Sequence, residues 1–287
     1  MTDLFSPEAV ECFIHCTHEV YEKHLGNYFG SLVKGFFTDE PTICFSGERV
    51  PAGSLLALPY YDGLPEDYRQ LTGGDLHSDI ARALATGSNF YEGPCNQLFA
   101  KRFRNHYVDR IAAWCKQRNM VLTGHLMDEN CAARGLLRNG HPLEVLGAFT
   151  LPGIDDIFTP CHAGQVEYLT LGSAMYAADR QKNGALAELF ALGPCDMEFD
   201  RMIRQFWLCA AFGIDHYVMA VSPLTAQGNA LKPNYYLPFT ETQPWFPCFR
   251  ELGQEAARAP RRLPGKGGGA PALPSATITR LNWSPIW

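Results

Sequence analysis

The chain has 287 residues, of which 46% are apolar and 19% charged, and its net charge is -6. A sizeable core excludes a globally disordered chain, and the absence of a basic face excludes a general nucleic-acid binder. No apolar run is long enough to cross a bilayer and no secretory segment opens the chain, so the sequence as it stands predicts a cytoplasmic protein without a membrane partner. The ten cysteines form no CxxC pair, which fits a reducing compartment.

The first predicted element is a helix over residues 7–25. Ser6 is a favoured N-cap residue, Pro7 suits the first turn, and the helix dipole favours the acid at Glu8. Apolar residues then recur at helical spacing as far as Gly26, which predicts one continuous helix.

A short strand is predicted next, over residues 32–38, and it runs directly into an acidic pair. Its apolar and aromatic composition is typical of a strand covered on both faces in a parallel sheet. Pro41 cannot extend the strand, so the carboxylates of Asp39 and Glu40 emerge at its carboxyl end. This is the edge where α/β barrels place their chemistry. The alternative is a solvated Asp-Glu turn.

Strands and helices alternate along the rest of the chain. Further helices are predicted over 65–71, 75–86, 95–118, 164–181, 196–213 and 245–258, with short ones before residue 148. Further strands are predicted over 120–123, 152–158, 185–190 and 214–221. This alternation indicates parallel βα units of the α/β class. Five strands are three fewer than a (β/α)8 TIM-type barrel contains, so we expect an incomplete barrel with about strands four to eight.

The composition changes after residue 258, where a Pro-, Arg- and Gly-rich stretch loses all periodicity. We therefore expect a partial-barrel catalytic domain over 1–258 and a disordered tail over 259–287. The sequence carries no signal of oligomeric state.

Two glutamates are candidates for catalysis. Glu40 and Glu188 each lie at or near the end of a predicted strand, so both would face the same edge of a barrel. Such a pair suits glycosidic bond cleavage, where one carboxylic acid protonates the leaving oxygen and the other carboxylate acts as base or nucleophile. The alternative for Glu188 is a surface acid.

Other polar residues follow the predicted strands and could form the walls of the same site. His125 and Glu129 are spaced HxxxE, which fits a substrate-orienting pair, a metal site or a plain helix start. Asp155 is either a further wall or part of a turn.

Three residues near the end of the pattern have both a functional and a structural interpretation. His216 and Tyr217, in the last predicted strand, either reach a sugar or belong to the core. Trp245 is either a stacking platform for a sugar or a core residue. The sequence has no GxGxxG after a strand, no P-loop and no GxSxG, so it gives no support to nucleotide binding or serine hydrolysis.

Several segments resemble, in order, the α-L-rhamnosidase-like glycoside hydrolases of family 106 and their relatives. These segments are residues 6–10, 17–19, 34–41, 122–125, 152–155, 188–190 and 213–217. The GFFTDEP and TGH segments are the most specific, and the resemblance runs from about residue 3 to about residue 247.

The resemblance implies a (β/α)8 catalytic barrel that takes a carbohydrate substrate, a rhamnoside or a related glycoside. It implies that Glu40 is the general acid, Glu188 the base and Glu129 a supporting residue, with an inverting mechanism. Some members have a calcium ion near the site, so the resemblance leaves open a calcium ion here. It implies no other cofactor.

The chain also departs from the family pattern. Family members are much longer, Ala187 stands where relatives tend to have a small hydroxyl residue, and the stretch after residue 259 does not continue the pattern. The alternative function is therefore a catalytically inactive, truncated barrel fragment that at most binds carbohydrate weakly.

Overall fold

The computed structural model describes most of the chain between residues 3 and 262. The described residues are 3–43, 59–88, 93–156, 184–190, 197–219, 239–241 and 243–262, with the single residues Gly172, Thr225 and Gln227. The predicted helix over 164–181 lies outside these residues apart from Gly172, and so does the predicted tail beyond residue 262. Within the described residues, no helix is long and apolar enough to cross a membrane.

The fold is of the α/β class, and five parallel strands carry it, as predicted. They are β1 (Gly35–Thr38), β2 (Val121–Gly124), β3 (Leu151–Asp156), β4 (Leu186–Leu189) and β5 (His216–Met219), and their order in the sheet is the order in the chain. Sequential parallel order with helical connections is the pattern of a (β/α) barrel. The numbering of these strands as four to eight of a barrel stays a prediction.

The chain divides into two compact units, residues 1–152 and residues 153–287, and β3 contributes to both. The first unit holds β1, β2 and the start of β3, and the second holds the remainder of β3 with β4 and β5. The last helix, α11 (Phe249–Arg262), continues four residues past the predicted domain end at residue 258.

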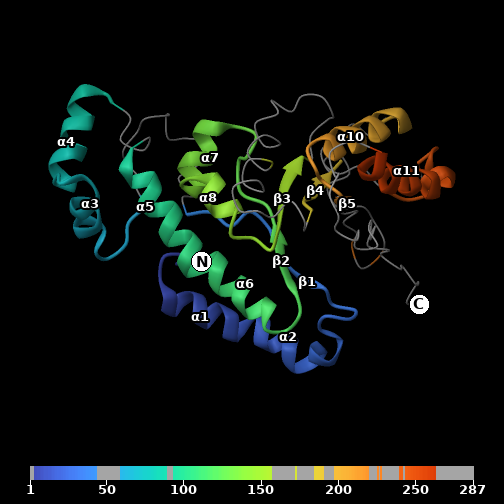
Figure 1. Cartoon of the computed structure of the whole chain (residues 1–287), viewed down its shortest axis with the longest axis horizontal. Helices are drawn as coiled ribbons and strands as arrows, with labels where there is room; N and C mark the ends of the chain where they lie inside the picture. Colours follow the sequence, from blue (N-terminus) through green and yellow to red (C-terminus); the bar gives the residue numbers. More distant parts are fainter. Residues whose placement is uncertain are drawn as a thin grey trace. The chain divides into compact units, whose positions relative to one another are not determined.

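Eight helices of the first unit are described beside its strands, and Figure 1 shows α3 and α4 farthest from β1 and β2. They are α1 (Pro7–Cys16), α2 (His18–Leu25), α3 (Leu64–Thr72), α4 (Leu76–Thr86), α5 (Pro94–Phe103), α6 (Asp109–Lys116), α7 (Ala132–Asn139) and α8 (Pro142–Leu146), with a 3-10 turn at Gly26–Tyr28. Figure 1 shows α5 and α6 as one long helical rod, with α1 and α2 running alongside it.

The predicted helix start is correct, but the prediction of one continuous helix to Gly26 is wrong. The Ser6 hydroxyl accepts a hydrogen bond from the Ala9 amide at 3.2 Å, as an N-cap does. The helix breaks at Thr17, whose φ of -122° is not helical. The break lets His18 begin a second helix with its side chain buried.

The long helix predicted over 95–118 also has an interruption. Residues Arg104–Val108 between α5 and α6 form a π-helical segment, which buries Tyr107 and Val108. A π turn adds one residue to the helical repeat and so changes which side chains share a face. Apolar periodicity alone does not distinguish this turn from α-helix.

The strand predicted over 32–38 is shorter and less covered than expected. The amides of Leu32 and Val33 both donate to the Tyr28 carbonyl, so a tight turn precedes β1, and Leu32 is 77% exposed. Phe36 packs against Trp114 with ring centroids 5.7 Å apart, whereas Phe37 is exposed. Among the described residues, β1 is therefore covered mainly on the Phe36 face.

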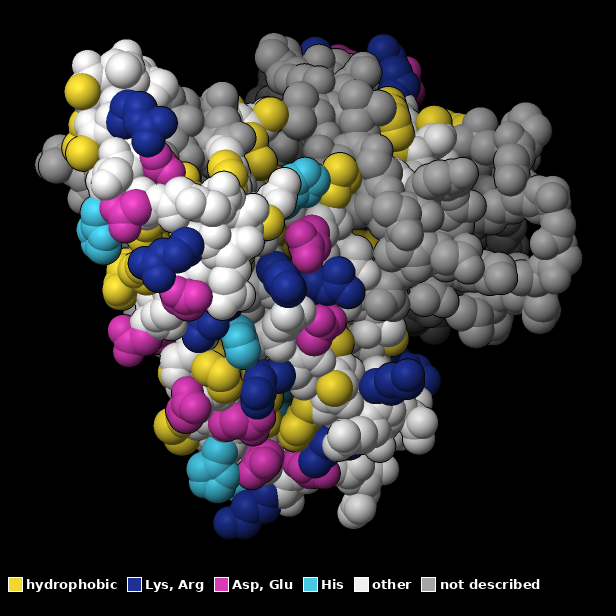
Figure 2. Space-filling model, turned by 60° about the vertical axis from the view of Figure 1, so that its left-hand side comes forward, with side chains coloured by type: hydrophobic (Ala, Val, Ile, Leu, Met, Phe, Trp, Pro, Cys, Tyr) yellow, Lys and Arg dark blue, Asp and Glu magenta, His cyan; other side chains and the backbone are white. Residues whose placement is uncertain are grey.

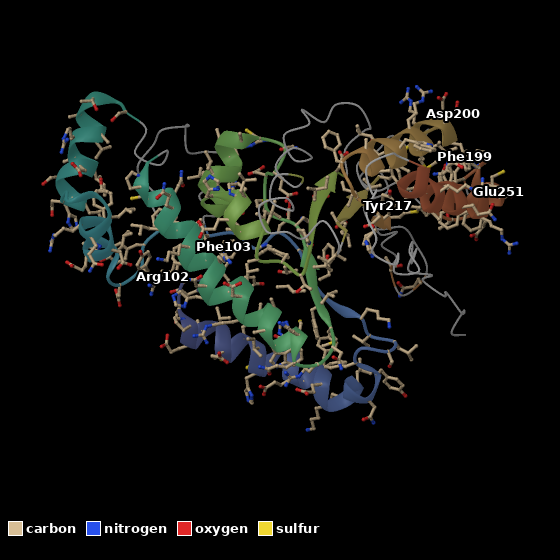
Figure 3. All side chains as sticks on the ribbon, in the orientation of Figure 1. Arg102, Phe103, Phe199, Asp200, Tyr217 and Glu251 are labelled. Carbon is tan, nitrogen blue, oxygen red and sulfur yellow. The ribbon has the colours of Figure 1, made fainter. Side chains whose placement is uncertain are left out.

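The second unit has its own core between its strands and two helices, α10 (Phe199–Ala211) and α11, with a 3-10 turn at Phe246–Cys248. Phe190, Phe206 and Leu252 are almost fully buried in it. Tyr217 belongs to this core, and Figure 3 labels it together with Asp200 and Glu251, which lie at exposed positions of the two helices. The core fixes β4 and β5 side by side.

Candidate active site

The acidic pair lies directly after β1, as predicted. Glu40 has a φ of 47°, in the left-handed region that non-glycine residues seldom occupy. Asp39 is exposed, while Glu40 is half-buried. The chain therefore changes direction at Glu40 instead of continuing the strand.

His125 follows the neighbouring strand β2 and lies close to the acidic pair. Its side chain is only 1% exposed, and its Nε2 lies 3.5 Å from Asp39 Oδ1. The imidazole also meets the edge of the Phe37 ring, with centroids 5.4 Å apart. The carboxylate and the imidazole thus form a polar pair across two adjacent strand ends.

The two strand ends meet so closely that only glycine fits between them. Gly124 pairs with Thr38 and has a φ of 137°, and a Cβ on Gly124 would lie 2.0 Å from the Thr38 carbonyl oxygen. This approach brings the residues that follow each strand, Asp39 and His125, into contact. The Thr38 hydroxyl also meets the Tyr107 hydroxyl at 2.9 Å.

The loop after β2 is held by its own acidic residues. Glu129 accepts a hydrogen bond from the Leu126 amide at 2.8 Å. Asp128, with a φ of 56°, accepts one from Arg138 at 3.0 Å. These contacts make Glu129 a loop-closing group beside His125, and its role as a supporting residue of the site stays a prediction.

Calcium takes six to eight oxygen ligands. In the first unit the Asp39 carboxylate instead faces an imidazole nitrogen, and Glu129 bonds the backbone. These two contacts assign no calcium ligand, so calcium stays an option that only the resemblance implies.

In the second unit, Asp155 and Glu188 are paired across β3 and β4. Paired residues of adjacent strands point to the same face of a sheet, so the two carboxylates are neighbours on that face. Asp155 thus belongs to a strand and not to a turn. The next residue, Asp156, is buried and accepts a hydrogen bond from Gln205.

Tyr217 and Trp245 have the contacts of core residues, whereas His216 is partly exposed and contacts the neighbouring Asp215. Tyr217 is buried, its hydroxyl donates to the Ile214 carbonyl at 3.1 Å, and burial raises its pKa. His216 Nδ1 lies 2.8 Å from Asp215 Oδ1 at the amino end of β5. Trp245 packs on the ring of Phe239, with centroids 5.5 Å apart.

One feature of the strand ends has no signal in the sequence. Among the described residues, three of the four non-glycine residues with positive φ follow the carboxyl ends of strands: Glu40 after β1, Asp128 after β2 and Phe190 after β4. A bulky residue such as Phe190 rarely adopts this conformation. Such backbone conformations cluster at active sites and ligand clamps, so they support this edge as the functional one.

The comparisons with known proteins find a likeness in fold. No family model matches the chain, and no curated protein matches its sequence. A rhamnosidase from Novosphingobium sp. PP1Y matches in structure, with a TM-score of 0.61 and 15% identity.

The fold resembles part of a rhamnosidase. The match covers 90% of this chain and 25% of the other chain, so the chain spans about a quarter of the rhamnosidase's length. At this identity the match supports the fold that the sequence resemblance implied. Membership of family 106 stays a prediction.

Proposed function

We propose that this chain carries glycoside hydrolase chemistry directed at a rhamnoside or a related glycosidic bond. The observation that carries the proposal is the likeness in fold to a rhamnosidase. The proposal is supported by the carboxylates that follow β1, by the carboxylate within β4 and by the positive-φ residues at the strand ends. A fold hosts many functions, so the activity rests on these side chains.

Two glutamates divide the chemistry in this proposal. Glu40 protonates the leaving glycosidic oxygen, and Glu188 removes a proton from the attacking water. The half-buried position of Glu40, beyond the turn in the chain, suits a group that must keep a proton. An inverting reaction gives a product of opposite anomeric configuration, which NMR of the first product detects.

The neighbours of these glutamates would bind and orient the sugar. The exposed Asp39 carboxylate would accept from sugar hydroxyls, and the buried His125, whose Nε2 lies 3.5 Å from Asp39 Oδ1, would orient that carboxylate. Asp155, paired with Glu188, offers a further acceptor on the same strand face.

The test is turnover of an aryl α-L-rhamnoside, with other aryl glycosides as a panel. We expect Glu188→Gln to lower kcat by about 100-fold or more on every substrate of the panel that is cleaved, and Glu40→Gln to do so where the leaving group needs a proton. Glu66→Gln and Glu251→Gln are matched controls, because both residues are exposed helical glutamates, and both variants should keep wild-type turnover. Wild-type turnover in Glu40→Gln would remove Glu40 from the role of acid.

The second candidate is a catalytically inactive fragment that binds carbohydrate weakly. Ala187 favours it, since relatives tend to have a hydroxyl residue beside the base and this position is fully buried here. This candidate predicts that rhamnose binds in titration calorimetry while no glycoside of the panel is cleaved.

A further inference from the structure

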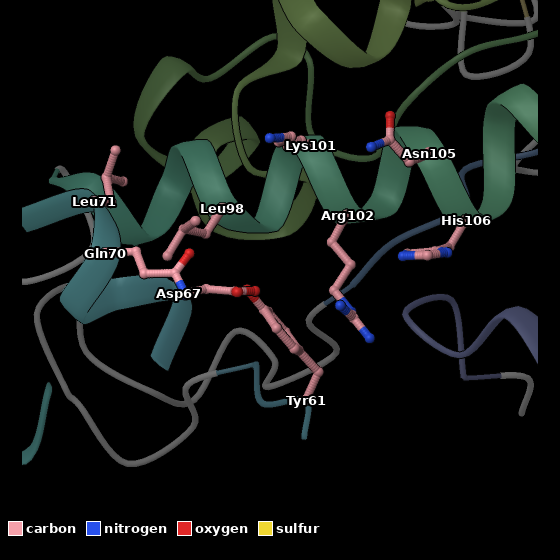
Figure 4. Close-up of a pocket in the computed structure, with 9 residues that line it drawn as sticks. All are labelled: Tyr61, Asp67, Gln70, Leu71, Leu98, Lys101, Arg102, Asn105 and His106. Carbon is pink, nitrogen blue, oxygen red and sulfur yellow. The ribbon is translucent and has the colours of Figure 1, made fainter. Parts of the chain in front are cut away.

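A cavity of about 350 Å³ lies in the first unit, away from the strand ends. It is bounded by Tyr61 and by residues of α3, α5 and the π segment, as Figure 4 shows. This volume is at the lower end of the range for sites that take a small molecule. None of the residues assigned to glycoside cleavage lines it.

Arg102, in the wall of the cavity, is held by the backbone and by an aromatic ring. Its Nε donates to the Phe5 carbonyl at 3.2 Å, and its guanidinium carbon lies 4.0 Å from the centroid of the Tyr61 ring. Tyr61 is itself fixed, because its hydroxyl donates to Asp67 at 2.8 Å.

The terminal nitrogens of Arg102 donate no hydrogen bond to any residue that the structure describes. An arginine fixed through Nε and stacked on a ring keeps its outer fork ready for a planar oxyanion. This geometry favours bidentate binding of a carboxylate or a phosphate.

The charges around the cavity favour an anion. Lys101, Arg102 and His106 supply donors, while the acidic residue Asp67 already accepts from Tyr61. In Figure 4, Arg102 and His106 lie on the same side of the helix as Tyr61, and Lys101 lies on the other. Basic and acidic side chains are interspersed on the face drawn in Figure 2, whereas the lining of this cavity holds Lys101, Arg102 and His106 against one acid, Asp67.

The π segment gives an independent pointer to a ligand. His106 lies within it, four residues after Arg102, and both side chains line the cavity. Single π turns inside α-helices occur frequently at functional sites.

We propose that this cavity binds the oxyanion group, carboxylate or phosphate, of a small polar molecule. The guanidinium fork of Arg102 binds two of its oxygens, and Lys101 and His106 add charge from the two sides of the helix. This proposal stands independently of the glycosidase function.

A dependence on pH follows from the groups that face His106. Burial lowers the pKa of His106, the nearby Arg102 and Arg110 lower it further, and Glu8 on α1 raises it. A bound anion offsets the two arginines, so His106 takes up a proton more readily in the complex. A carboxylate, which stays ionised over the range where a histidine titrates, therefore binds more tightly as the pH falls, and His106→Gln should lose this dependence.

The test is titration calorimetry of the full chain at low salt, with inorganic phosphate, glucuronate and neutral glucose as probes. We expect phosphate, glucuronate or both to bind and glucose to fail, and the stronger of the two anions identifies the class. Arg102→Gln should weaken binding by about tenfold or more, and Lys101→Gln by a smaller factor. Lys116→Gln, an exposed lysine on α6, is the matched control and should leave affinity unchanged.

Two results would overturn the proposal. One is the lack of binding heat from both anions at millimolar concentration. The other is an affinity for the anion that is the same in wild type, in Lys101→Gln and in Arg102→Gln. If Arg102→Gln fails to fold, Lys101→Gln and His106→Gln decide the matter, because the described structure gives neither side chain a hydrogen bond to lose.

Discussion

The hydroxyl of Tyr107 lies 2.9 Å from the hydroxyl of Thr38, although the two residues are 69 positions apart in the chain. The π segment delivers Tyr107 to this place, and Thr38 is the last residue of β1. The carboxylates of Asp39 and Glu40 follow immediately. One buried tyrosine thus fixes the strand end on which the proposed acid depends.

We predict that Tyr107→Phe and Thr38→Val each lower the free energy of unfolding by about 1 kcal/mol, because each removes one partner of a partly buried hydrogen bond. The double variant should lose clearly less than the sum, since the bond can be lost only once. Urea unfolding measures all three variants. Tyr28→Phe, at an exposed tyrosine, is the control, and full additivity of the two variants would contradict the assigned bond.

Gly124→Ala should destabilise the protein severely, by about 3 kcal/mol or more, because a positive φ and a backbone clash act together. The added Cβ would lie 2.0 Å from the Thr38 carbonyl oxygen. Gly73→Ala is the matched control, with a φ of 73° and no atom within 4 Å of its Cβ, and we expect a loss of about 1 kcal/mol. Similar thermal unfolding of the two variants would contradict the close approach.

His18 should make stability depend on pH. Its ring packs between Phe36 and Trp114, and burial lowers its pKa below the ordinary 6.5. The unfolded chain therefore binds a proton at a higher pH than the folded chain does. The contribution of neutral His18 to the free energy of unfolding is fully present above about pH 6.5. It is lost as the pH falls toward the lower pKa of His18 in the folded chain.

His18→Phe should reduce this loss of stability, because the ring that replaces the imidazole carries no proton. Urea unfolding at a series of pH values between about 5 and about 7.5 measures it. His77→Gln, at an exposed histidine of α4, should keep the wild-type change of unfolding free energy with pH. An unchanged slope in His18→Phe would show that His18 does not cause it.

Asp215 should be a structural residue of the second unit. Its Oδ1 accepts from the Ala185 amide at 3.2 Å and lies 2.8 Å from His216 Nδ1, so it joins the starts of β4 and β5. We expect Asp215→Ala to cost about 1 to 3 kcal/mol, because a partly buried amide loses its acceptor. Asp200→Ala, at an exposed position of α10, should change stability by about 0.5 kcal/mol or less in the same urea titration.

The positions of the five strands could be predicted because short apolar runs ending at polar or turn residues are strong signals. The residues at which the strands begin and end could not all be predicted. Leu32 looks like a strand residue, yet the turn at Tyr28 leaves it exposed, since backbone hydrogen bonds there are set by three-dimensional context. The break at Thr17 and the π segment escape a periodicity analysis for the same reason.

The places of several candidate residues could be predicted, but their roles toward a substrate stay predictions. Asp39, His125 and Asp155 stand out in the sequence because they are polar residues after or at the end of apolar strands. The sequence could not reveal Tyr107, which reads as one more apolar position of a helix, or the backbone conformation of Phe190. For Tyr217 the sequence left both a sugar contact and a core position open, because the partner of its hydroxyl, the Ile214 carbonyl, cannot be seen in a sequence.

The most direct measurement of the central claim compares two leaving groups in Glu40→Gln. The leaving group of a dinitrophenyl rhamnoside departs without a proton, whereas the leaving group of an alkyl rhamnoside needs a proton from the general acid. If Glu40 is that acid, the variant keeps most of the wild-type kcat on the dinitrophenyl substrate and loses about 100-fold or more on the alkyl substrate. Equal losses on both substrates, or no loss on either, would contradict the role of Glu40 and with it the proposed chemistry.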